Sequence, residues 1–534
     1  MKRSLLCLGL ISLSLPAWAE VRLPGIFGDH MVLQQGASLP VWGTADPGEK
    51  VTVTIGGRTA SATADASGKW NVRLEPLPPD GQGLKLEVKG SNELVFNDVV
   101  VGEVWLCSGQ SNMAWTVQDS NDAAEAIAQA KLPAIRLFTV GKRISWEPET
   151  EQGGRWVVCS PETVKRFSAV GYFFGREIEA ARKAPVGLIG SYWGATPAEA
   201  WTSLEALKAN PALAHYASGF EKTKADREVL RKKYYEEILP KHNEAVAVWK
   251  KEHEEPFKQR LADWEKEAAA ARAEGKPVPK KPELKVMAPR PPRSVDGNPR
   301  HPSVLFNGMI NAIIPYAIRG VIWYQGEGNA GTPESAALYE TLFPAMVADW
   351  RGRWGQGDFP FLYVQLAAFG RGKFFPELRE AQRRSLAMPN SAMAVAIDIG
   401  DRNDIHPRNK REVGRRLALL ARREVYGERE LIATGPVATA AKADGAKVRV
   451  EFAATGNVDT DLQIREGGPS GFEIAGEDGF FRPAFARVEG NCVVLESASV
   501  RVPKKIRYAW APYPDAALFN QEGLPAAPFA LDVR

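Results

Sequence analysis

Ser111 and His406 are the residues of this chain whose types and surroundings best suit nucleophilic catalysis. Ser111 stands in the stretch SGQSNM, directly behind the apolar run 99–106. This position predicts a strand-to-helix turn that exposes a hydroxyl at the carboxyl edge of a parallel sheet, where such folds place ligands. The stretch does not fit Gly-x-Ser-x-Gly, because Met113 takes the last position. On local grounds alone, an ordinary helix N-cap is the better interpretation of Ser111.

A serine nucleophile needs a base, and histidine is scarce in this chain. The six histidines are His30, His215, His242, His253, His301 and His406. The first four fall in a β unit, a stretch of small helical residues or a charged helical segment. His406 stands in DIGDRNDIHPRNK, where Asp398, Asp401 and Asp404 are near enough in sequence to orient an imidazole. The alternative is that this Asp-rich loop is a metal site or a cap; His301 is interpreted as a loop histidine near the substrate.

The stretch GEGNAG at 326–331 matches the glycine pattern of a dinucleotide-binding turn. A Rossmann unit also needs an acid at the end of the next strand, about 20 residues on, to hold the ribose hydroxyls. Here the next strand, FLYVQLAAF, ends at Phe369 and Gly370. No P-loop sequence occurs either. These features favour a hydrolase that uses no nucleotide cofactor.

The elements that must position these residues form an interrupted α/β pattern. A chain of 534 residues suggests about three compact units. At 99–219 and again at 301–430, apolar strands such as VVVGEVWL and RGVIWYQ alternate with helical stretches, which is typical of a parallel sheet covered by helices. Short alternating strands at 20–98 and 431–534 predict a β domain at either end.

Residues 220–300 form a charged insertion in the α/β pattern. Apolar residues recur there at three- and four-residue spacing, which predicts two or more long amphipathic helices. These residues are Leu230, Tyr234, Ile238, Phe257, Leu261 and Trp264. We expect Pro240 and Pro256 to break the helices, and the run KPVPKKPELKVMAPRPPR to return as a loop. The insertion is interpreted as a helical arm with a solvated face rather than as a binding element.

The first 19 residues fit a cleaved export signal. Lys2 and Arg3 precede an apolar stretch that ends in Ala17-Trp18-Ala19, the small-x-small pattern of a cleavage site. The alternative, a lone membrane anchor, needs about 20 apolar residues, and the stretch is shorter. No later stretch is long enough for a membrane span. We expect cleavage after Ala19 and a periplasmic or secreted product without a lipid anchor.

Cysteine count and charge exclude several classes of protein. After the leader, Cys107, Cys159 and Cys492 remain, and no two stand at C-x-x-C spacing. Buried thiols are therefore favoured over a zinc site or a disulfide scaffold. The 68 basic and 64 acidic residues nearly balance, without the excess that nucleic-acid binding requires. We expect neither a metal nor a nucleic-acid partner, and the sequence leaves the oligomeric state open.

Four blocks of the sequence resemble the sialate O-acetylesterase-type family, a branch of the SGNH hydrolase superfamily of serine esterases. The blocks are GEVWLCSGQSNM, SYWGATPAEAW, RGVIWYQGEGNA and DIGDRNDIHPRNKREVGRRLA, in this order between about 100 and 420. The ending KIRYAWAPYPDAALFNQEGLPAAPF and the early β unit also resemble that family. The resemblance implies a three-layer α/β/α domain with a parallel sheet, flanked by the two β units; the insertion at 220–300 has no counterpart that we can place.

The resemblance implies a role for individual residues. Ser111 would attack an acetyl carbonyl, and His406 would take its proton and return it to the leaving sugar oxygen. The oxyanion would be held by the backbone N–H groups of Ser111 and Gly194 and by the side-chain amide of Gln325 or Asn329. No metal or cofactor is implied.

The sequence departs from the family pattern at two positions near these implied catalytic residues. Many SGNH enzymes carry the acid three residues before the histidine, where this chain has Asn403. We take Asp404 as the orienting acid, with Asp401 behind it and a serine-histidine dyad as the alternative. The usual third block is Gly-Glu-Ser-Asn, so Gly328 replaces a serine and removes a hydroxyl near the site.

The sequence thus predicts an exported serine esterase that removes O-acetyl groups from carbohydrate. Sialic acid is the family's name-giving substrate, and acetylated xylan or another polysaccharide is the alternative. Predicted substrate contacts are Gln110, Trp193, Glu327 and His301. Aromatic residues near the blocks could stack on sugars or belong to the core: Trp115, Tyr192, Trp193, Trp201 and Tyr324. An alternative of another class is a non-catalytic carbohydrate-binding protein on the same fold.

Overall fold

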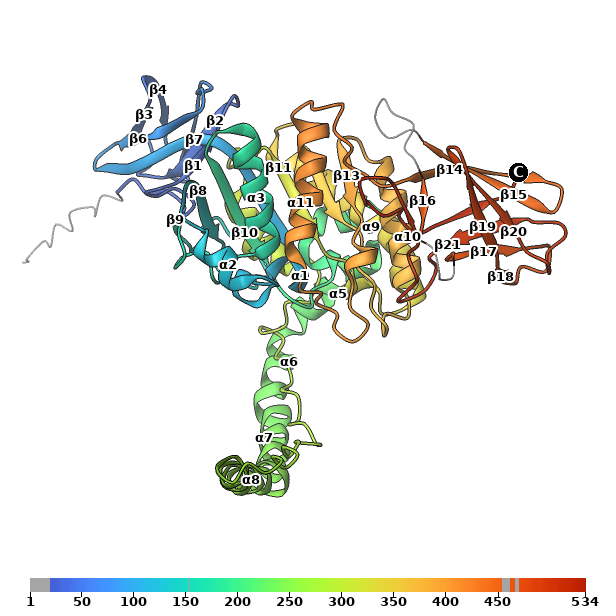
Figure 1. Ribbon diagram of the computed structural model, residues 1–534. Helices are drawn as coiled ribbons and strands as arrows, with labels where there is room; N and C mark the ends of the chain where they lie inside the picture. The colour runs from blue at the N-terminus through green and yellow to red at the C-terminus, as the bar shows by residue number, and fades with distance from the viewer. Residues whose placement is uncertain (1–19, 152, 454–461, 466–469) are drawn as a thin grey trace, which may run out of the picture.

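The structure, a computed structural model, describes residues 20–151, 153–453, 462–465 and 470–534. The expected leader, residues 1–19, lies outside the described residues. Figure 1 shows a group of strands at one end, a central sheet flanked by helices, a second group of strands at the other end, and a helical arm that projects from the central part.

Seven strands in the order β13-β12-β11-β7-β10-β8-β9 cross the central part. Their bounds are β7 Glu93–Gly109, β8 Leu132–Thr139, β9 Trp156–Cys159, β10 Val186–Tyr192, β11 Gly320–Tyr324, β12 Phe361–Val364 and β13 Ser391–Ala394. Neighbouring strands are parallel, except that β9 runs antiparallel to β8. Strands β10, β11 and β12 are buried at every residue, as expected for strands with both faces covered. The predicted α/β fold with additional β units is confirmed.

Helices pack in pairs on the central sheet. α3 (Ala169–Arg182) packs against α11 (Lys410–Leu420), and α9 (Pro333–Trp354) packs against α10 (Phe375–Arg384). The short helices of this part are α1 (Ser111–Ala114), α2 (Ala123–Ala128) and α4 (Leu204–Ala209). Asn409 caps α11 by accepting the backbone N–H of Glu412 at 3.2 Å. This cap fixes the end of the loop that carries His406.

The N-terminal strands continue into the central sheet. They are β1 Val32–Gln34, β2 Leu39–Thr44, β3 Lys50–Ile55, β4 Arg58–Thr63, β5 Lys69–Leu74 and β6 Asp80–Lys89. β6 pairs with the first half of β7, and the second half of β7 lies between β10 and β11. One hydrophobic core, from Val21 to Ala433, includes both parts. The two parts are therefore joined by a shared strand and a shared core.

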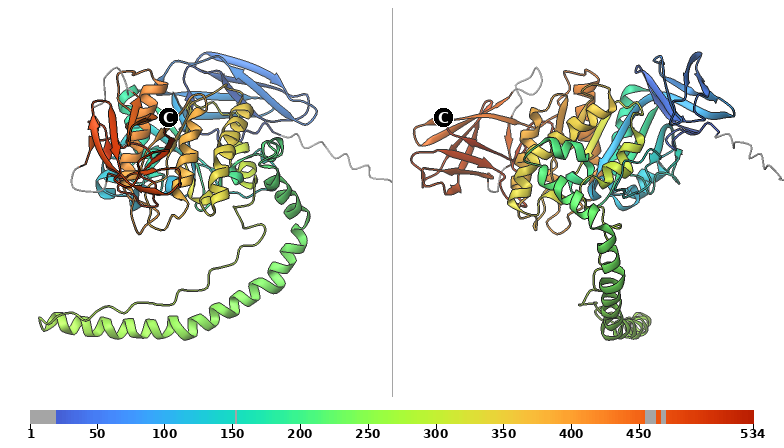
Figure 2. Two further views of the ribbon diagram at one scale, coloured as in Figure 1. Left: turned by 90° about the vertical axis from the view of Figure 1, so that its right-hand side faces the viewer. Right: turned by 180° about the vertical axis from the view of Figure 1, so that it is seen from behind.

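The insertion forms one long, curved helical arm (Figure 2). It contains α5 (Ala214–Ala225), α6 (Arg227–Lys233), α7 (Leu239–Trp249) and α8 (Glu255–Ala273), with π-helical turns at Tyr234–Ile238 and Lys250–Glu254. The chain then returns along the concave side of the arm without regular structure. The Nε1 of Trp249 donates to the carbonyl of Val286, and that of Trp264 donates to the carbonyl of Pro279, so both rings hold the returning segment.

The prediction that two prolines break the arm is wrong. Pro240 and Pro256 each stand two positions after the last residue of a π-helical turn, as the second residue of the next helix. A proline ring clashes with the carbonyl four residues before it in a regular α-helix. The wider π turn removes this conflict, because its hydrogen bonds span five residues. The arm therefore continues through both prolines.

The C-terminal strands form a separate unit with its own hydrophobic core. Two four-stranded sheets, β14-β15-β20-β19 and β18-β17-β21-β23, make up most of it. The strands are β14 Val437–Asp444, β15 Lys447–Ala453, β16 Gln463–Ile464, β17 Phe472–Ala475, β18 Phe481–Pro483, β19 Phe485–Glu489, β20 Cys492–Glu496, β21 Lys505–Tyr508, β22 Leu518–Phe519 and β23 Phe529–Asp532. Among the described residues Cys107 and Cys159 are buried free thiols, and Cys492 is a half-buried one.

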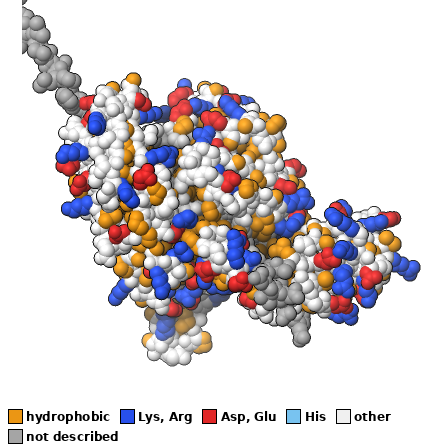
Figure 3. Space-filling model, turned by 90° about the horizontal axis from the view of Figure 1, so that it is seen from above, with side chains coloured by type: hydrophobic (Ala, Val, Ile, Leu, Met, Phe, Trp, Pro, Cys, Tyr) orange, Lys and Arg blue, Asp and Glu red, His pale blue; other side chains and the backbone are white. Residues whose placement is uncertain are grey.

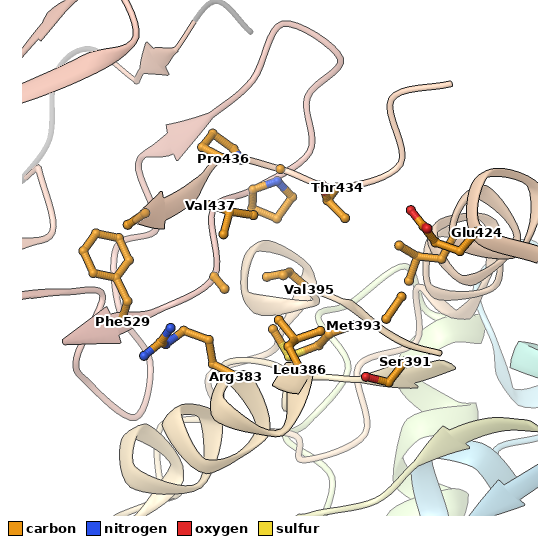
Figure 4. A pocket seen from close by; sticks show the side chains of 16 residues that line it. Arg383, Leu386, Ser391, Met393, Val395, Glu424, Thr434, Pro436, Val437 and Phe529 are labelled. Carbon is orange, nitrogen blue, oxygen red and sulfur yellow. The ribbon is translucent and has the colours of Figure 1, made fainter. Parts of the chain in front are cut away.

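A hollow of about 310 Å³ lies where β13 meets the C-terminal unit (Figure 4). Its lining includes Met393 and Val395 from the central part and Val437 and Phe529 from the C-terminal unit. None of its lining residues is a predicted site residue. On the face drawn in Figure 3, basic and acidic side chains are interspersed, in keeping with the near balance of 68 and 64 such residues in the chain.

Candidate active site

Ser111 lies at the carboxyl edge of the central sheet, on the side from which the arm projects (Figure 1). β7 ends at Gly109, whose φ is +134°, and α1 begins two residues later. A Cβ at position 109 would lie 2.2 Å from the carbonyl oxygen of Tyr324, so only glycine fits this turn. Gln110, not Ser111, is the N-cap residue of α1. The interpretation of Ser111 as a helix cap is therefore wrong.

The structure brings Ser111 and His406 together although 295 positions separate them in the chain. The Oγ of Ser111 lies 2.9 Å from Nε2 of His406, a hydrogen-bond distance. Trp115, in the turn after α1, stacks on the imidazole with ring centroids 5.0 Å apart and an interplanar angle of 20°. The pair thus has the contact that a serine nucleophile and its base require.

Asp404 is the acid of the Asp-rich loop that lies next to His406. Its Oδ1 is 3.5 Å from Nδ1 of His406 and also accepts the backbone N–H of His406 at 2.9 Å. Asp401 instead accepts the backbone N–H groups of Asn403 and Asp404, at 2.7 and 3.0 Å. Asp398 pairs with Arg416 through both of its oxygens. Asp401 therefore shapes the turn, and Asp404 alone among the three contacts the imidazole.

The surroundings of His406 favour its neutral form. Burial lowers the pKa of His406 below its ordinary value of 6.5, and the positive charge of Lys410 lowers it further, while Asp404 acts in the opposite direction. A neutral imidazole can accept a proton from a hydroxyl. Within the described residues, no group of three or more His, Cys, Asp or Glu side chains is arranged to hold a metal ion.

Gly194 lies directly beside Ser111. A Cβ at position 194 would lie 3.3 Å from Cβ of Ser111, so the two backbones approach closely. The next residue, Ala195, has a φ of +58°, and its carbonyl accepts a hydrogen bond of 2.6 Å from Arg300 at the end of the returning segment. The root of the arm thus contacts the loop that brings Gly194 to the serine.

Of the two candidate amides, Asn329 fits an oxyanion hole better than Gln325. The Oδ1 of Asn329 accepts the N–H of Ala198 and the Nε2 of Gln325, each at 2.8 Å, which directs its Nδ2 to the other side. Nδ2 donates to Glu199 at 2.8 Å and has a second hydrogen to offer. Gln325 is fully buried and uses both Nε2 hydrogens, on Thr196 and Asn329. Gln325 therefore has no Nε2 hydrogen left unused in this structure and contacts Asn329 as a support.

Two of the predicted substrate contacts have side chains that are engaged inside the protein: Gln110 is buried, and Glu327 is half-buried with its Oε2 atom buried. Gln110 is 2% exposed, and its Oε1 accepts the backbone N–H of Gly328 at 3.0 Å. Glu327 accepts a hydrogen bond of 2.5 Å from Nδ2 of Asn112, and burial raises its pKa. The prediction that these two side chains touch substrate is therefore not supported. Sequence patterns do not reveal their burial, because other segments of the chain provide it.

The other predicted contacts lie nearer the surface. Trp193 is half-buried, with Nζ of Lys142 5.5 Å from its ring centroid. His301 is half-buried and packs on Trp146, with centroids 5.2 Å apart. Among the other aromatic candidates, Tyr192, Trp201 and Tyr324 belong to the buried core, whereas Trp115 is half-buried.

Gly328 stands where the structure leaves no room for a side chain. A Cβ there would lie 2.6 Å from the carbonyl oxygen of Thr196. A serine at this position would therefore force the 193–197 loop away from the 326–329 loop. Because Gly328 has no side chain, the backbone of the loop that carries Gly194 lies in close contact with the backbone of the loop that carries Asn329.

Sequence reasoning missed Asn112, Glu199 and Lys410. Asn112 stands beside Ser111 in SGQSNM, and Glu199 stands in the block SYWGATPAEAW that carries Gly194, so their places in these blocks were a usable signal. Lys410 carried none: a lysine at the start of a basic helix is usually solvated. Here it is fully buried.

Comparisons with known proteins agree with one another. A family described as carbohydrate esterase, sialic acid-specific acetylesterase, matches residues 302–422. The sialate O-acetylesterase of Rattus norvegicus is 31% identical over 564 positions, which cover 95% of this chain and 94% of that protein. The sialate O-acetylesterase of Homo sapiens is 32% identical over 81% of this chain and 77% of that protein.

A solved structure extends the similarity to the whole fold. The crystal structure of XAC1771, a novel carbohydrate acetylesterase from Xanthomonas citri, matches with a TM-score of 0.76 and 35% sequence identity. The match covers 96% of this chain and 100% of that one. Both β units and the central part therefore have counterparts in one known architecture.

Proposed function

The chain belongs to the sialate O-acetylesterase family and is a carbohydrate esterase, and from this premise we propose that Ser111 and His406 carry out the reaction. The observation that supports the proposal most directly is the 2.9 Å contact between Oγ of Ser111 and Nε2 of His406. It lies at the carboxyl edge of a parallel sheet, where such folds bind ligands. Among the described residues, no helix is long and apolar enough to cross a membrane.

In the first half of the reaction, Oγ of Ser111 attacks the carbonyl carbon of a sugar-bound acetyl group while Nε2 of His406 takes the hydroxyl proton. The carbonyl oxygen becomes an oxyanion. It is stabilised by the backbone N–H groups of Ser111 and Gly194 and by the second Nδ2 hydrogen of Asn329. His406 then gives its proton to the sugar oxygen, which leaves, and an acetyl group remains on Ser111.

In the second half, water replaces the sugar. His406 takes a proton from the water, whose oxygen attacks the acetyl carbon. The tetrahedral intermediate uses the same three donors, and its collapse releases acetate and restores the proton to Ser111. Asp404 stabilises the imidazolium that exists between these transfers, since its carboxylate lies 3.5 Å from Nδ1.

The substrate that we propose is an O-acetylated sialic acid. The support is the activity named for the relatives that match nearly the whole chain. Acetylated xylan or another acetylated polysaccharide is the second candidate, favoured by the carbohydrate acetylesterase from Xanthomonas citri. The half-buried rings of Trp193 and Trp115 are our candidates for stacking on a sugar, since they stand in or beside the sequence blocks that carry Gly194 and Ser111. The non-catalytic binding alternative has no specific observation in its favour.

We also propose that the protein is exported, on the basis of the charged and apolar leader at residues 1–19. A cleaved leader leaves a mature chain that begins at Glu20. N-terminal sequencing of protein recovered from the periplasm or medium tests this directly. A mature chain that still begins at Met1 would contradict it.

The function is tested by acetate release from O-acetylated sialic acid and from acetylated xylan, side by side, with wild type and Ser111→Ala. We expect acetate from one of the two substrates and a loss of several orders of magnitude in the variant. Release from neither substrate, with the enzyme active on an aryl acetate, would contradict the proposed substrates but not the mechanism. Retained activity in Ser111→Ala would contradict the mechanism.

A further inference from the structure

A buried cation and a buried carboxylate face each other across one amide behind the catalytic pair. Lys410, the first residue of α11, is fully buried, and its Nζ donates to Oδ1 of Asn112 at 2.5 Å. Nδ2 of Asn112 donates to Oε1 of Glu327, also at 2.5 Å. Asn112 is 1% exposed. Three polar side chains from three different segments thus form one buried unit, Lys410–Asn112–Glu327.

This unit is attached to both catalytic residues. Asn112 follows Ser111 in α1, so the unit is covalently next to the nucleophile. Nδ2 of Asn112 also donates to the carbonyl of Ile405 at 3.0 Å, one residue before His406. The amide of Asn112 therefore connects the helix that carries the serine to the loop that carries the histidine.

Lys410 also acts on the imidazole through space. Its Nζ lies 5.9 Å from the ring centroid of Trp115, the indole that stacks on His406, and 5.4 Å from that of Tyr324. The charged groups that influence His406 are Lys410 and Asp404, and those that influence Lys410 are Glu327 and Asp404. Burial lowers the pKa of Lys410 to about 7, against the opposite effect of both carboxylates.

A contribution to the stability of the fold does not explain why Lys410, Asn112 and Glu327 lie together. Removing a lysine and a carboxylate from water costs several kcal/mol for each ion, and a buried pair often stabilises a protein less than apolar side chains of the same volume. Within the described residues, Oε2 of Glu327 and the hydroxyl of Tyr324 are buried without a hydrogen-bond partner. Buried polar atoms without partners, such as those of Glu327 and Tyr324, lower the stability of a core. Their place beside Ser111 and His406 points to catalysis.

We propose that Lys410, Asn112 and Glu327 are positioning residues for His406, building on the serine mechanism above. Asn112 holds the backbone at Ile405 so that Nε2 of His406 stays within reach of Ser111. Lys410 disfavours a second proton on the resting imidazole, and Glu327 supplies the counter-charge that lets the lysine remain buried. Tyr324 and Tyr339 are the further titratable groups around Glu327. None of the three positioning residues touches the substrate.

The test uses the full chain and an aryl acetate, so that sugar recognition does not enter. Lys410→Met removes the charge at similar length, and Arg411→Met removes a charge from the next, more exposed position of α11 as a matched control. Without the Lys410 charge, the imidazolium is less disfavoured and the pKa of His406 rises. We expect the acidic limb of the kcat/KM profile to move up by about 0.5–1 pH unit in Lys410→Met and to stay in place in Arg411→Met. An unmoved limb in an active Lys410→Met protein would overturn the role of the charge.

A double-mutant comparison of Tm tests the unit independently and does not depend on catalytic activity in any of the variants. Lys410→Met and Glu327→Gln each leave one buried charge without its partner, so each is expected to lower Tm. In Lys410→Met/Glu327→Gln both charges are absent, and we expect a Tm loss clearly smaller than the sum of the two single losses. Additive losses would overturn the coupling between the two residues. Loss of hydrolysis in Ser111→Ala, measured alongside, shows separately whether the serine mechanism itself holds.

Discussion

The side-chain nitrogen of Asn329 donates a hydrogen bond of 2.8 Å to the carboxyl group of Glu199, a half-buried residue. Together with the N–H of Ala198 on Oδ1, this bond fixes which end of the amide is the donor. One Nδ2 hydrogen is used on Glu199, and the other is the one that we propose is donated to the oxyanion. A preoriented donor of this kind stabilises an oxyanion without reorganisation during the reaction.

We therefore predict that Asn329→Ala lowers kcat by about 10²- to 10³-fold, as the loss of one oxyanion donor does in other esterases and proteases. KM should change much less, because the donor acts mainly in the transition state. Steady-state kinetics on an aryl acetate, at a temperature at which the variant is folded by circular dichroism, measures both constants. A fall in kcat below tenfold would argue against Asn329 as a donor.

The pH profile should reflect the burial of His406. Catalysis requires the neutral imidazole, and burial together with Lys410 lowers the pKa of His406 below 6.5. Activity should therefore persist as the pH falls through 6.5 and disappear only as it falls through the lower pKa of the folded protein. The acidic limb of kcat/KM reports this value for the free enzyme. A limb centred above pH 6.5 would contradict the prediction.

The two aspartates of the loop should differ in their effects. Asp404→Asn is expected to lower kcat/KM by about 10- to 100-fold, less than the ~10⁴-fold known for a buried triad aspartate. The reasons are the 3.5 Å distance to Nδ1 and the 43% exposure of the Asp404 side chain. Asp401→Asn is the matched control, since an amide oxygen can still accept the two backbone N–H groups of the turn. Equal losses in both variants would favour the serine-histidine dyad.

Gly328→Ser is predicted to destabilise the protein although it restores the residue usual in the family. Its Cβ would lie 2.6 Å from the carbonyl oxygen of Thr196. Relieving such a contact in a packed region typically costs about 1–3 kcal/mol. Urea unfolding of wild type and variant measures the difference. An unchanged midpoint would mean that the 193–197 loop can move at no cost.

The central fold was predictable because its strands carry a strong pattern. Runs such as RGVIWYQ are apolar at successive positions, and the strand that forms there, β11, is buried throughout. The behaviour of Pro240 and Pro256 was not predictable, because the widened turns before them depend on backbone geometry that the residue types do not specify. The position of the arm relative to Ser111 likewise depends on contacts such as that of Arg300 with Ala195.

The two reacting residues of the site could be predicted from the sequence. The residues that hold them in position were harder to predict. The small number of histidines and the four blocks together indicated Ser111 and His406, which the structure places in contact. The choice between Gln325 and Asn329 required the orientation of two amides. Gln110 and Lys410 are buried, and the carboxyl group of Glu327 is bound, by segments far away in the chain, so polar residue type alone predicted contact with substrate or solvent instead.

The formation of an acetyl-enzyme on Ser111 can be tested most directly by trapping this intermediate. The enzyme is mixed with an excess of an aryl acetate, quenched in acid within the first turnovers, digested and analysed by mass spectrometry. We expect one acetyl group per chain, on the peptide that contains Ser111, and none in Ser111→Ala. Acetylation of another residue, with hydrolysis retained in Ser111→Ala, would contradict it.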